Sequence, residues 1–452
     1  MRQSCHLIRR AYAHPTGLIP RRTLLTLAIE TSCDDTSVAV LEKHTSRKNS
    51  ATLHYHAKIT SDNRAAKGVQ PIVAHESHQK TLSGLVKEAL QHLPLQAPDA
   101  ANLENALLVR TEHGALQCRK KPDFVTATRG PGMRANLITG VDTAKGLAVA
   151  WQVPFLGVNH MQAHALTPRL VSALEAEENG NSTTKVEPEF PFLTLLVSGG
   201  HTMLVHSRHL CNHEILASSL DKPIGNSVDH STRDILPLRI LESVTDVMYG
   251  RTLENFAFPE EQPEYGYRPV FNSKGNFVRR SDDEGVPSLG VPLSQRATDM
   301  AYSFSGLSSE VRRCMEKEPE MDESRRRTMA RQFMQVAFEH LASRVLLALK
   351  MPAIKDVKTL VVSGGVASNQ FLKHVLRTVL DARGHQELRL VFPPPKYCTD
   401  NAAMIAWTGI ETWEAGWRTD LSALAVNKWS IDPRADDGGI LGLDGWLRSK
   451  DV

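Results

Sequence analysis

The chain of 452 residues lacks several patterns that would assign it to a familiar class. Its six cysteines are scattered and include no C-x-x-C pair, which argues against a disulfide scaffold and against a thiolate zinc site. No apolar run approaches the roughly 18 residues that a membrane-spanning helix needs. A Walker loop and a G-x-G-x-x-G fingerprint are also missing, so the nucleotide folds built on them are unsupported. We therefore expect a packed protein from a reducing compartment, with no membrane partner.

Acidic residues are missing from residues 1–23, which contain five arginines. This composition, without a long apolar stretch, is typical of a mitochondrial transit peptide, and we expect the mature chain in the mitochondrial matrix. A disordered basic tail is the alternative. The formal net charge of +3 becomes −2 once these five arginines are set aside. Overall charge therefore does not indicate a nucleic-acid binder, and RNA contact would need a local basic patch.

Apolar strands alternate with glycine turns and amphipathic helices in both halves of the chain. Residues 24–42 have the pattern of a strand, a tight turn and a second strand, and residues 190–207 repeat it. Helical periodicity and further strands follow each hairpin. The recurrence predicts an α/β protein of two related lobes with a ligand cleft between them.

We place the N-terminal lobe at 24–165 and the C-terminal lobe at 166–452. Residues 94–121 have no clear periodicity and are expected to form an irregular insertion. A segment around 258–295 is rich in proline, glycine and charge, which predicts a surface insertion.

Two histidines, His160 and His164, follow a short apolar strand. If Asn159 caps a helix there, both imidazoles lie on one face and can share a cation; two ordinary histidines at a helix start are the alternative. Met161 stands where a zinc-peptidase helix has its catalytic glutamate, which disfavours peptidase chemistry. Asp400 offers a third ligand, although a helix cap is its alternative role.

Two V-S-G-G sequences, ending at residues 200 and 365, each follow an apolar strand. Glycine amides can approach a phosphate closely because no Cβ intervenes, while a plain tight turn is the alternative. Asn369, near the start of the next helix, could reach a ribose or a base.

Charged clusters have two interpretations each. Glu30, Asp34 and Asp35 surround a turn. In one interpretation these carboxylates bind a cation or polarise a reacting amine; in the other they are solvated residues that form the turn. Basic clusters are either an RNA surface or solvated faces; they lie at Arg119–Lys121, Arg279–Arg280 and Arg325–Arg331.

Six stretches together resemble the universal tRNA N6-adenosine threonylcarbamoyltransferases, and in particular their mitochondrial branch. They are LAIETSCDDTSVAVL, RGPGMRANLITGVDTAKGLAVAWQVPFLGVNHMQAHAL, LLVSGGHTMLV, YSFSGL, LVVSGGVASNQFL and CTDNAAMIAW. The motifs span about residues 25–410 in the order found in that family.

The resemblance implies a two-lobed actin-like, hexokinase-like and Hsp70-like (ASKHA) fold. It also implies transfer of threonylcarbamoyl from threonylcarbamoyl-AMP to the exocyclic amine of the adenosine 3′ of the anticodon, in tRNAs reading ANN codons, with release of AMP. The implied partners are the tRNA anticodon loop, a separate synthase that supplies the intermediate, and a second copy of the chain in a homodimer.

The resemblance assigns site residues as well. One divalent metal, zinc or iron, would be held by His160, His164 and Asp400. The intermediate would contact Leu196, Val197, Ser198, Gly199, Gly200, Asp229, Gly250 and Asn369. Asp34 is our candidate for the carboxylate that accepts the amine proton.

The chain departs from the family pattern at three points. His230 stands after Asp229 where lysine is usual, a P-G-G motif is absent so that only Gly250 matches, and GPGMRANL replaces the commoner GPGLVGAL. A small-molecule kinase of the same fold and a non-catalytic nucleotide-binding subunit are the alternative functions.

Overall fold

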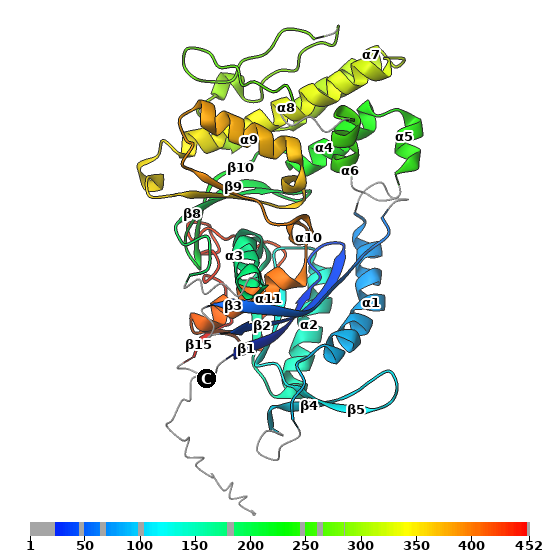
Figure 1. Cartoon of the computed structure of the whole chain (residues 1–452), viewed down its shortest axis with the longest axis vertical. Coiled ribbons are helices and arrows are strands. Elements are labelled where there is room, and N and C mark those ends of the chain that lie inside the picture. Colours follow the sequence, from blue (N-terminus) through cyan, green and yellow to red (C-terminus); the bar gives the residue numbers. More distant parts are fainter. Residues whose placement is uncertain are drawn as a thin grey trace, which may run out of the picture.

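The computed structural model describes residues 23–44, 49–63, 69–97, 104–178, 185–244, 249–259, 265–283 and 285–449. The expected transit peptide lies outside these ranges, except for its last residue. Two β-sheets with their own helices follow one another along the long axis of the molecule (Figure 1).

The first sheet has seven strands in the order β15-β14-β7-β6-β1-β2-β3. The predicted hairpin is confirmed as an antiparallel pair in which Thr23 faces His44. Strand bounds are β1 Thr23–Glu30, β2 Asp35–His44, β3 Ser50–Thr60, β6 Phe124–Gly130, β7 Phe155–Asn159, β14 Trp417–Thr419 and β15 Trp446–Arg448.

Helices cover both faces of this sheet, because the apolar side chains of its strands alternate between them. In β1, Leu25, Leu27 and Ile29 pack with α1 and α2, whereas Leu24 and Ala28 pack with α3 and α11. The helix bounds are α1 Pro71–Gln91, α2 Arg134–Trp151, α3 His160–Glu178 and α11 Ala402–Glu414.

The second sheet has six strands in the order β11-β10-β9-β8-β12-β13. Its strands are β8 Phe192–Val197, β9 Thr202–His209, β10 Asn212–Ser219, β11 Ala301–Tyr302, β12 Thr359–Ser363 and β13 Arg389–Val391. The accompanying helices are α4 Ile224–Ile235, α5 Leu238–Ser243, α6 Tyr249–Ala257, α7 Ser305–Lys317, α8 Glu323–Ala348, α9 Gln370–Ala382 and α10 Pro395–Cys398, with short 3-10 turns η3 Ser294–Arg296, η4 Pro352–Ile354 and η5 Gly365–Ser368.

The sheets do not divide the chain at residue 165. That position lies inside α3, and the C-terminal end of the chain returns to the first sheet as α11, β14 and β15. The return is driven by burial, because α11 is apolar on nearly every side and Trp407 at its centre is 0% exposed. A lobe running continuously from 166 to 452 therefore does not describe the structure.

Two further expectations need correction. Residues 94–121 are not wholly irregular, because β4 Ala106–Arg110 and β5 Leu116–Lys120 pair into a small antiparallel sheet. The 258–295 segment is not only a surface excursion, since Tyr267, Phe277 and Val286 are buried in the core of the second lobe. Within the described ranges, no helix combines the length and the apolar composition needed to cross a membrane.

Candidate functional site

The two histidines begin α3, immediately after the last residue of β7. Asn159 ends that strand and caps the helix: its Oδ1 accepts hydrogen bonds from the backbone N–H groups of Met161 at 2.9 Å and Gln162 at 3.1 Å. The predicted cap is thus confirmed, and one helical turn separates His160 from His164 on a shared face. Their ring centroids are 4.7 Å apart and the rings are nearly perpendicular.

Asp400 is free to face the histidines because its neighbour caps α11. Asn401 Oδ1 accepts a hydrogen bond from the Met404 N–H at 3.0 Å. The alternative in which Asp400 is the cap is therefore wrong. Asp400 Oδ1 instead lies 3.1 Å from His164 Nε2 and 3.4 Å from His160 Nε2.

These three side chains have the spacing of a metal site. Bonds of about 2.1 Å in a tetrahedron put neighbouring ligand atoms about 3.4 Å apart. The potential ligand atoms of His160, His164 and Asp400 all lie within 4.8 Å of one another, and both histidines are buried. Two imidazole nitrogens and one carboxylate also form a donor set suited to zinc or iron.

A second carboxylate orients His160. Glu30 at the end of β1 is fully buried, and its Oε2 lies 3.2 Å from His160 Nδ1. Nδ1–H donation to this carboxylate leaves Nε2 as the nitrogen that faces Asp400, the arrangement usual for metal-binding histidines.

The two carboxylates make the site strongly negative. Burial alone would lower the pKa of His160, but Asp400 and then Glu30 outweigh it and raise the pKa to about 10. Burial raises the pKa of Asp400, yet the charge and hydrogen bond of His160 hold it well below its usual value. The field that retains a proton on His160 would equally favour a cation in its place.

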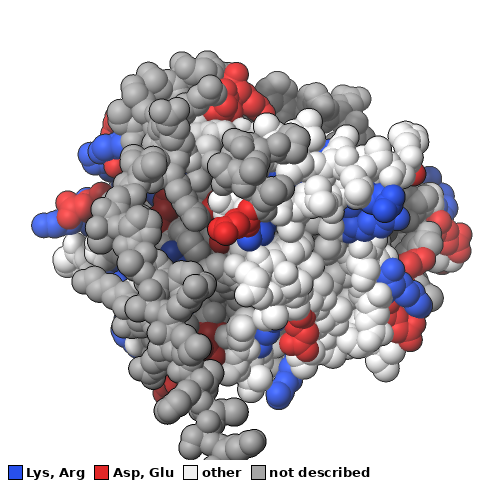
Figure 2. Space-filling view, turned by 90° about the horizontal axis from the view of Figure 1, so that it is seen from below, with Lys and Arg blue, Asp and Glu red and all other residues white. Residues whose placement is uncertain are grey.

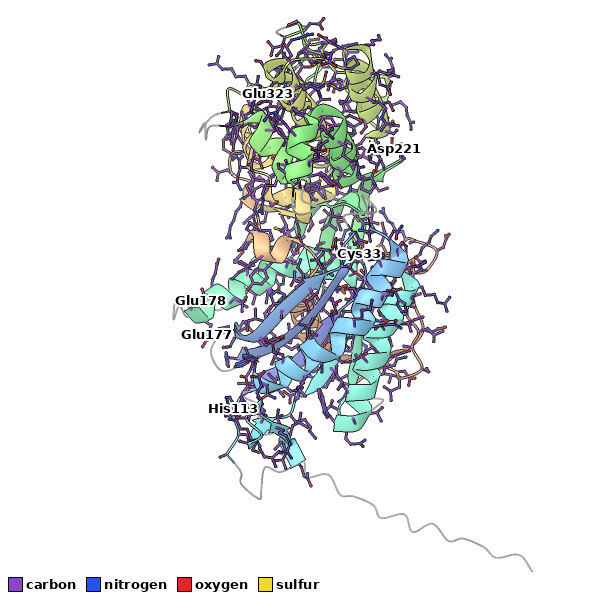
Figure 3. All side chains as sticks on the ribbon, turned by 90° about the vertical axis from the view of Figure 1, so that its right-hand side faces the viewer. Cys33, His113, Glu177, Glu178, Asp221 and Glu323 are labelled. Carbon is purple, nitrogen blue, oxygen red and sulfur yellow. The ribbon has the colours of Figure 1, made fainter. Side chains whose placement is uncertain are left out.

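The turn between β1 and β2 adds Asp34 and Asp35 to this region. Asp35 Oδ2 pairs with Lys58 Nζ at 2.8 Å, and that ammonium also donates to Thr399 Oγ1 at 2.9 Å. Burial, followed by the charge of Asp400, raises the pKa of Asp34. Figure 3 labels the preceding residue, Cys33, where the two lobes approach each other.

The two V-S-G-G turns lie side by side because β8 and β12 are parallel neighbours, with Leu196 opposite Ser363. Gly364 has φ +102°, and a Cβ there would clash with the carbonyl oxygen of Val197. A Cβ on Gly365 would lie 3.9 Å from Thr399, the neighbour of Asp400. The carboxyl edge of the second sheet therefore adjoins the histidine–aspartate cluster.

The start of α4 packs against one side of the first glycine turn. The Gly225 N–H donates to the Ser198 carbonyl at 3.2 Å, and a Cβ on Gly225 would lie 2.7 Å from Gly199 N. Nothing lies within 4 Å of a Cβ built on Gly199 or Gly200, so this side of the turn is open.

The other residues assigned to the intermediate are placed more variably. Leu196 and Val197 are buried, so only their main chain can face a ligand. Asp229 lies on α4, and burial raises its pKa to about 6. Gly250 lies on α6, where a Cβ added to it would be 3.5 Å from the side chain of Val228. Asn369 caps α9 by accepting from the Leu372 N–H at 2.8 Å, which occupies its side-chain oxygen.

His201 was not singled out from the sequence, although the charges of His160 and His164 act on it. Burial, followed by those charges, lowers the pKa of His201 to about 4. Its position directly after the first S-G-G was the available signal.

The basic clusters are largely engaged within the protein. Arg325 pairs with Glu318, Arg327 with Glu323, Arg280 with Glu339 and Lys120 with Glu42. On the part of the lower face that grey atoms do not cover in Figure 2, blue and red side chains are scattered without a continuous basic band. These clusters therefore do not locate an RNA surface.

Comparison with known proteins gives a consistent result. A family profile described as tRNA N6-adenosine threonylcarbamoyltransferase matches residues 116–407. The chain is 35% identical over 438 residues to the mitochondrial tRNA N6-adenosine threonylcarbamoyltransferase of Schizosaccharomyces pombe, covering 95% of this chain and 90% of the relative. It is 31% identical to the tRNA N6-adenosine threonylcarbamoyltransferase of Methylocapsa acidiphila, covering 91% and 97% respectively.

Among solved structures, HypF of T. kodakarensis aligns with 87% of this chain and 48% of its own, at 11% identity and a TM-score of 0.43. The match to the family covers well over half of the chain, and the two-sheet architecture agrees with the two-lobed ASKHA fold expected from the sequence. This chain therefore belongs to the mitochondrial branch of the tRNA N6-adenosine threonylcarbamoyltransferase family, transferases that act in the synthesis of threonylcarbamoyladenosine in tRNA.

Proposed function

We propose that the chain transfers a threonylcarbamoyl group from threonylcarbamoyl-AMP to the exocyclic amine of the adenosine 3′ of the anticodon, in mitochondrial tRNAs that read ANN codons, releasing AMP. The observation that carries the proposal is that three donors from distant parts of the sequence converge beside two adjacent glycine turns, the first of which is open. A kinase of the same fold has no use for this histidine pair.

His160, His164 and Asp400 would hold one zinc or iron ion. When bound, such an ion supplies Lewis-acid stabilisation and orients substrate oxygens. The residues around the donors support this role, because Glu30 fixes the His160 ring and Asn401 holds the α11 end from which Asp400 projects.

The glycine turns would bind the AMP part of the co-substrate. Amides of Ser198, Gly199 and Gly200 can approach the phosphate because no side chain lies on the open side of the turn. Val197 and Leu196 would contribute main-chain groups, while Asp229, Gly250 and Asn369 would surround the nucleoside. Binding at this edge keeps the mixed anhydride beside the donor cluster.

The anhydride is already activated, so the protein mainly has to position a weak nucleophile against the carbamoyl carbon. The N–C bond forms as the C–O bond to AMP breaks, and the amine then loses a proton. Asp34 is the proposed acceptor, because its raised pKa makes it a stronger base than an ordinary aspartate. An anticodon loop suits such a site, since its bases can be splayed out and presented singly.

Three partner and location assignments belong to the same proposal. A separate synthase supplies threonylcarbamoyl-AMP, two copies of the chain form a homodimer, and residues 1–23 direct the protein to the mitochondrial matrix. The arginine-rich, acid-free composition of that segment supports the last assignment.

Reconstitution tests the activity. The chain without residues 1–23 is mixed with a threonylcarbamoyl-AMP synthase, ATP, threonine, bicarbonate and unmodified tRNA, and the tRNA nucleosides are analysed by mass. We expect threonylcarbamoyladenosine only when both proteins are present, and its loss on chelation with recovery after zinc or iron is returned.

Matched histidine variants test the metal assignment. His160→Ala should abolish modification while the thermal unfolding curve stays cooperative, whereas His209→Ala, at an exposed position at the end of β9, should behave as wild type. Full activity of His160→Ala would refute the assigned ligand set.

A further inference from the structure

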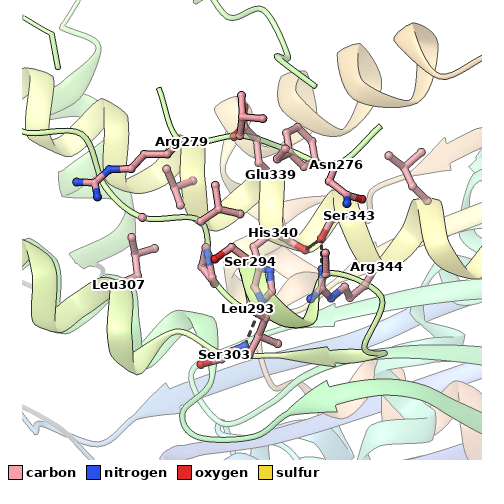
Figure 4. A pocket seen from close by; sticks show the side chains of 18 of the residues that line it. Asn276, Arg279, Leu293, Ser294, Ser303, Leu307, Glu339, His340, Ser343 and Arg344 are labelled. Atoms are coloured by element: carbon pink, nitrogen blue, oxygen red, sulfur yellow. Dashed lines mark hydrogen bonds between the residues drawn. The ribbon is translucent and has the colours of Figure 1, made fainter. Parts of the chain in front are cut away.

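A cavity of about 620 Å³ lies in the second lobe, between the 272–297 segment and helices α7 and α8 (Figure 4). None of the residues assigned to the metal or to the co-substrate lines it. Its volume is within the range of pockets that hold small organic molecules. The segment expected to be a surface insertion therefore builds one wall of this cavity.

The lining combines apolar and basic side chains. Phe277, Val291, Leu293, Leu307, Val336 and Leu346 supply apolar surface. Five lining residues are basic and two are acidic; the basic ones are Arg279, Arg313, Arg344, Lys350 and Arg383.

Both acidic residues already have partners. Glu339 Oε1 accepts from Arg280 at 2.7 Å and from the Tyr267 hydroxyl at 3.0 Å. Glu310 Oε2 accepts from the Gly290 N–H at 2.7 Å. Glu310 keeps its charge, because its partner is neutral, but two carboxylates cannot balance five basic side chains, so the lining has an excess of positive charge.

Arg344 is the buried member of the basic set, at 3% exposure. Its Nε donates to the Ala301 carbonyl at 2.9 Å and its Nη1 to Ser343 Oγ at 2.8 Å. Across the described part of the chain, its Nη2 has no hydrogen-bond partner; the charge of Asp299 acts on Arg344, but that carboxylate pairs with Arg296 at 2.5 Å. Burial consequently lowers the pKa of Arg344. An unpaired buried guanidinium is costly unless an anion satisfies it.

His340 stands one turn before Arg344 on α8, and Figure 4 shows the two side chains next to each other. Its Nε2 accepts a hydrogen bond from the Ser303 N–H at 3.1 Å, so the proton of the neutral ring is on Nδ1. Burial, helped by Arg344, lowers the pKa of His340 to about 3, which keeps the ring neutral. No described residue accepts from Nδ1.

We propose that this cavity binds a small organic anion, whose carboxylate or phosphate group is held by Arg344 and His340 and whose apolar part fills the remaining space. Both nitrogens are buried and have no partner among the described residues, so the two side chains must turn toward the ligand to bind it. A planar guanidinium N–H and a neighbouring imidazole N–H are then donors suited to two oxygens of one anionic group. The apolar lining then selects an organic anion over a bare inorganic one.

Ligand-observed NMR and titration calorimetry test the proposal with phenylacetate, phenyl phosphate, inorganic phosphate and neutral benzyl alcohol as probes. At least one of the two aryl anions should bind saturably and at least tenfold more tightly than benzyl alcohol and inorganic phosphate. Arg344→Gln should weaken that binding at least tenfold. Ala297→Phe, which adds a ring to the cavity wall and leaves the Arg344 side chain in place, should also remove it.

Binding of phenyl phosphate at the first glycine turn is excluded with Gly200→Val, whose side chain would enter the open side of that turn and should leave cavity binding unchanged. Ala297→Phe carries the test if Arg344→Gln does not fold. The proposal is overturned if no aryl anion binds saturably, if benzyl alcohol binds as tightly, or if a folded Arg344→Gln or Ala297→Phe variant binds like wild type.

Discussion

At the scale of single residues, the orientation of one imidazole decides what the candidate site can hold. His160 Nδ1 lies 3.2 Å from Glu30 Oε2 and 3.2 Å from Ser32 Oγ, which leaves Nε2 toward Asp400. Glu30 also accepts from the Ser32 N–H and the Thr128 hydroxyl, so its own position is fixed. Glu30, which is fixed at the end of β1, thus sets the orientation of the His160 ring at the start of α3.

Replacing this carboxylate should weaken metal binding. Glu30→Gln retains the size of the side chain but loses the charge that strengthens the His160 hydrogen bond. Loss of such a partner typically costs 10–100-fold in metal affinity, and we expect about that loss in a competition titration with a zinc chelator. Glu42→Gln is the control, because Glu42 bonds to His54 and Lys120 instead. Equal affinities for both variants would contradict the positioning role of Glu30.

Gly225 tests the contact that closes the glycine turn. In Gly225→Ala the new Cβ would lie 2.7 Å from main-chain atoms of Ser198 and Gly199, so the turn or α4 must shift. Such overpacking costs about 1–3 kcal/mol, and we expect that loss in chemical unfolding together with a raised KM for threonylcarbamoyl-AMP.

Gly84→Ala is the matched control for that substitution. Gly84 lies in α1 with nothing within 4 Å of a built Cβ, so alanine should stabilise the helix by about 0.5–1 kcal/mol. A Gly225→Ala protein as stable and active as wild type would show that the close approach is not required.

At the level of helices and strands, the candidate metal ligands lie at or beside the starts of two helices. α3 starts where β7 stops, and α11 starts two residues after Asp400, with Asn401 between them as its cap. Asn401 is fully buried, and its Nδ2 donates to the Thr399 carbonyl at 2.8 Å. One amide therefore fixes both the start of the helix and the loop that carries the ligand.

Removing this amide should affect stability and the site together. Asn401→Ala loses the cap and leaves buried carbonyls without donors, so the free energy of unfolding should fall by about 2–3 kcal/mol. Zinc affinity should fall as well, because Asp400 is no longer held. Asn369→Ala removes the cap of α9 and should cost about 1 kcal/mol without changing zinc affinity. An Asn401→Ala protein with unchanged zinc affinity would show that Asn401 is not needed to hold Asp400 in position.

At the scale of the whole molecule, α3 and α11 join the lobes. They pack on the first sheet, yet α3 begins at the donor cluster and α11 follows the loop next to the second sheet. Arg169 on α3 pairs with Glu411 on α11 at 2.8 Å in a largely buried setting. The chain therefore crosses between the sheets at the functional site.

Buried histidines should make global stability depend on pH. His213 is fully buried; its Nε2 donates to the Leu210 carbonyl at 2.7 Å, and burial lowers its pKa from 6.5 to about 4. Below pH 6.5 the unfolded chain binds a proton that native His213 does not, so stability falls as the pH drops from about 6.5 to about 4. The pKa difference corresponds to a loss on the order of 3 kcal/mol.

Thermal unfolding between pH 4.5 and pH 7.5 measures this linkage. The midpoint should fall with pH less steeply in His213→Gln than in wild type, whatever the variant's stability at pH 7.5. His209→Gln, at an exposed position, provides the reference for a histidine outside the core. Parallel midpoint curves for wild type and His213→Gln would rule out His213 as a contributor.

Features that depend on neighbouring residues could be predicted before the fold was known. Alternating apolar residues specified the two hairpins, and Asn159 before His160 specified a capped helix with both imidazoles on one face, because strand and helix periods and caps act over a few residues. The joint motifs specified the family. Contacts between distant residues became visible only in the folded chain: Asp400 reaches the histidines, Glu30 orients one of them, the two glycine turns meet through parallel strands, and an apparent insertion forms one wall of a cavity. Such contacts are set by how sheets and helices bury their apolar faces, and no spacing along the chain encodes that distance.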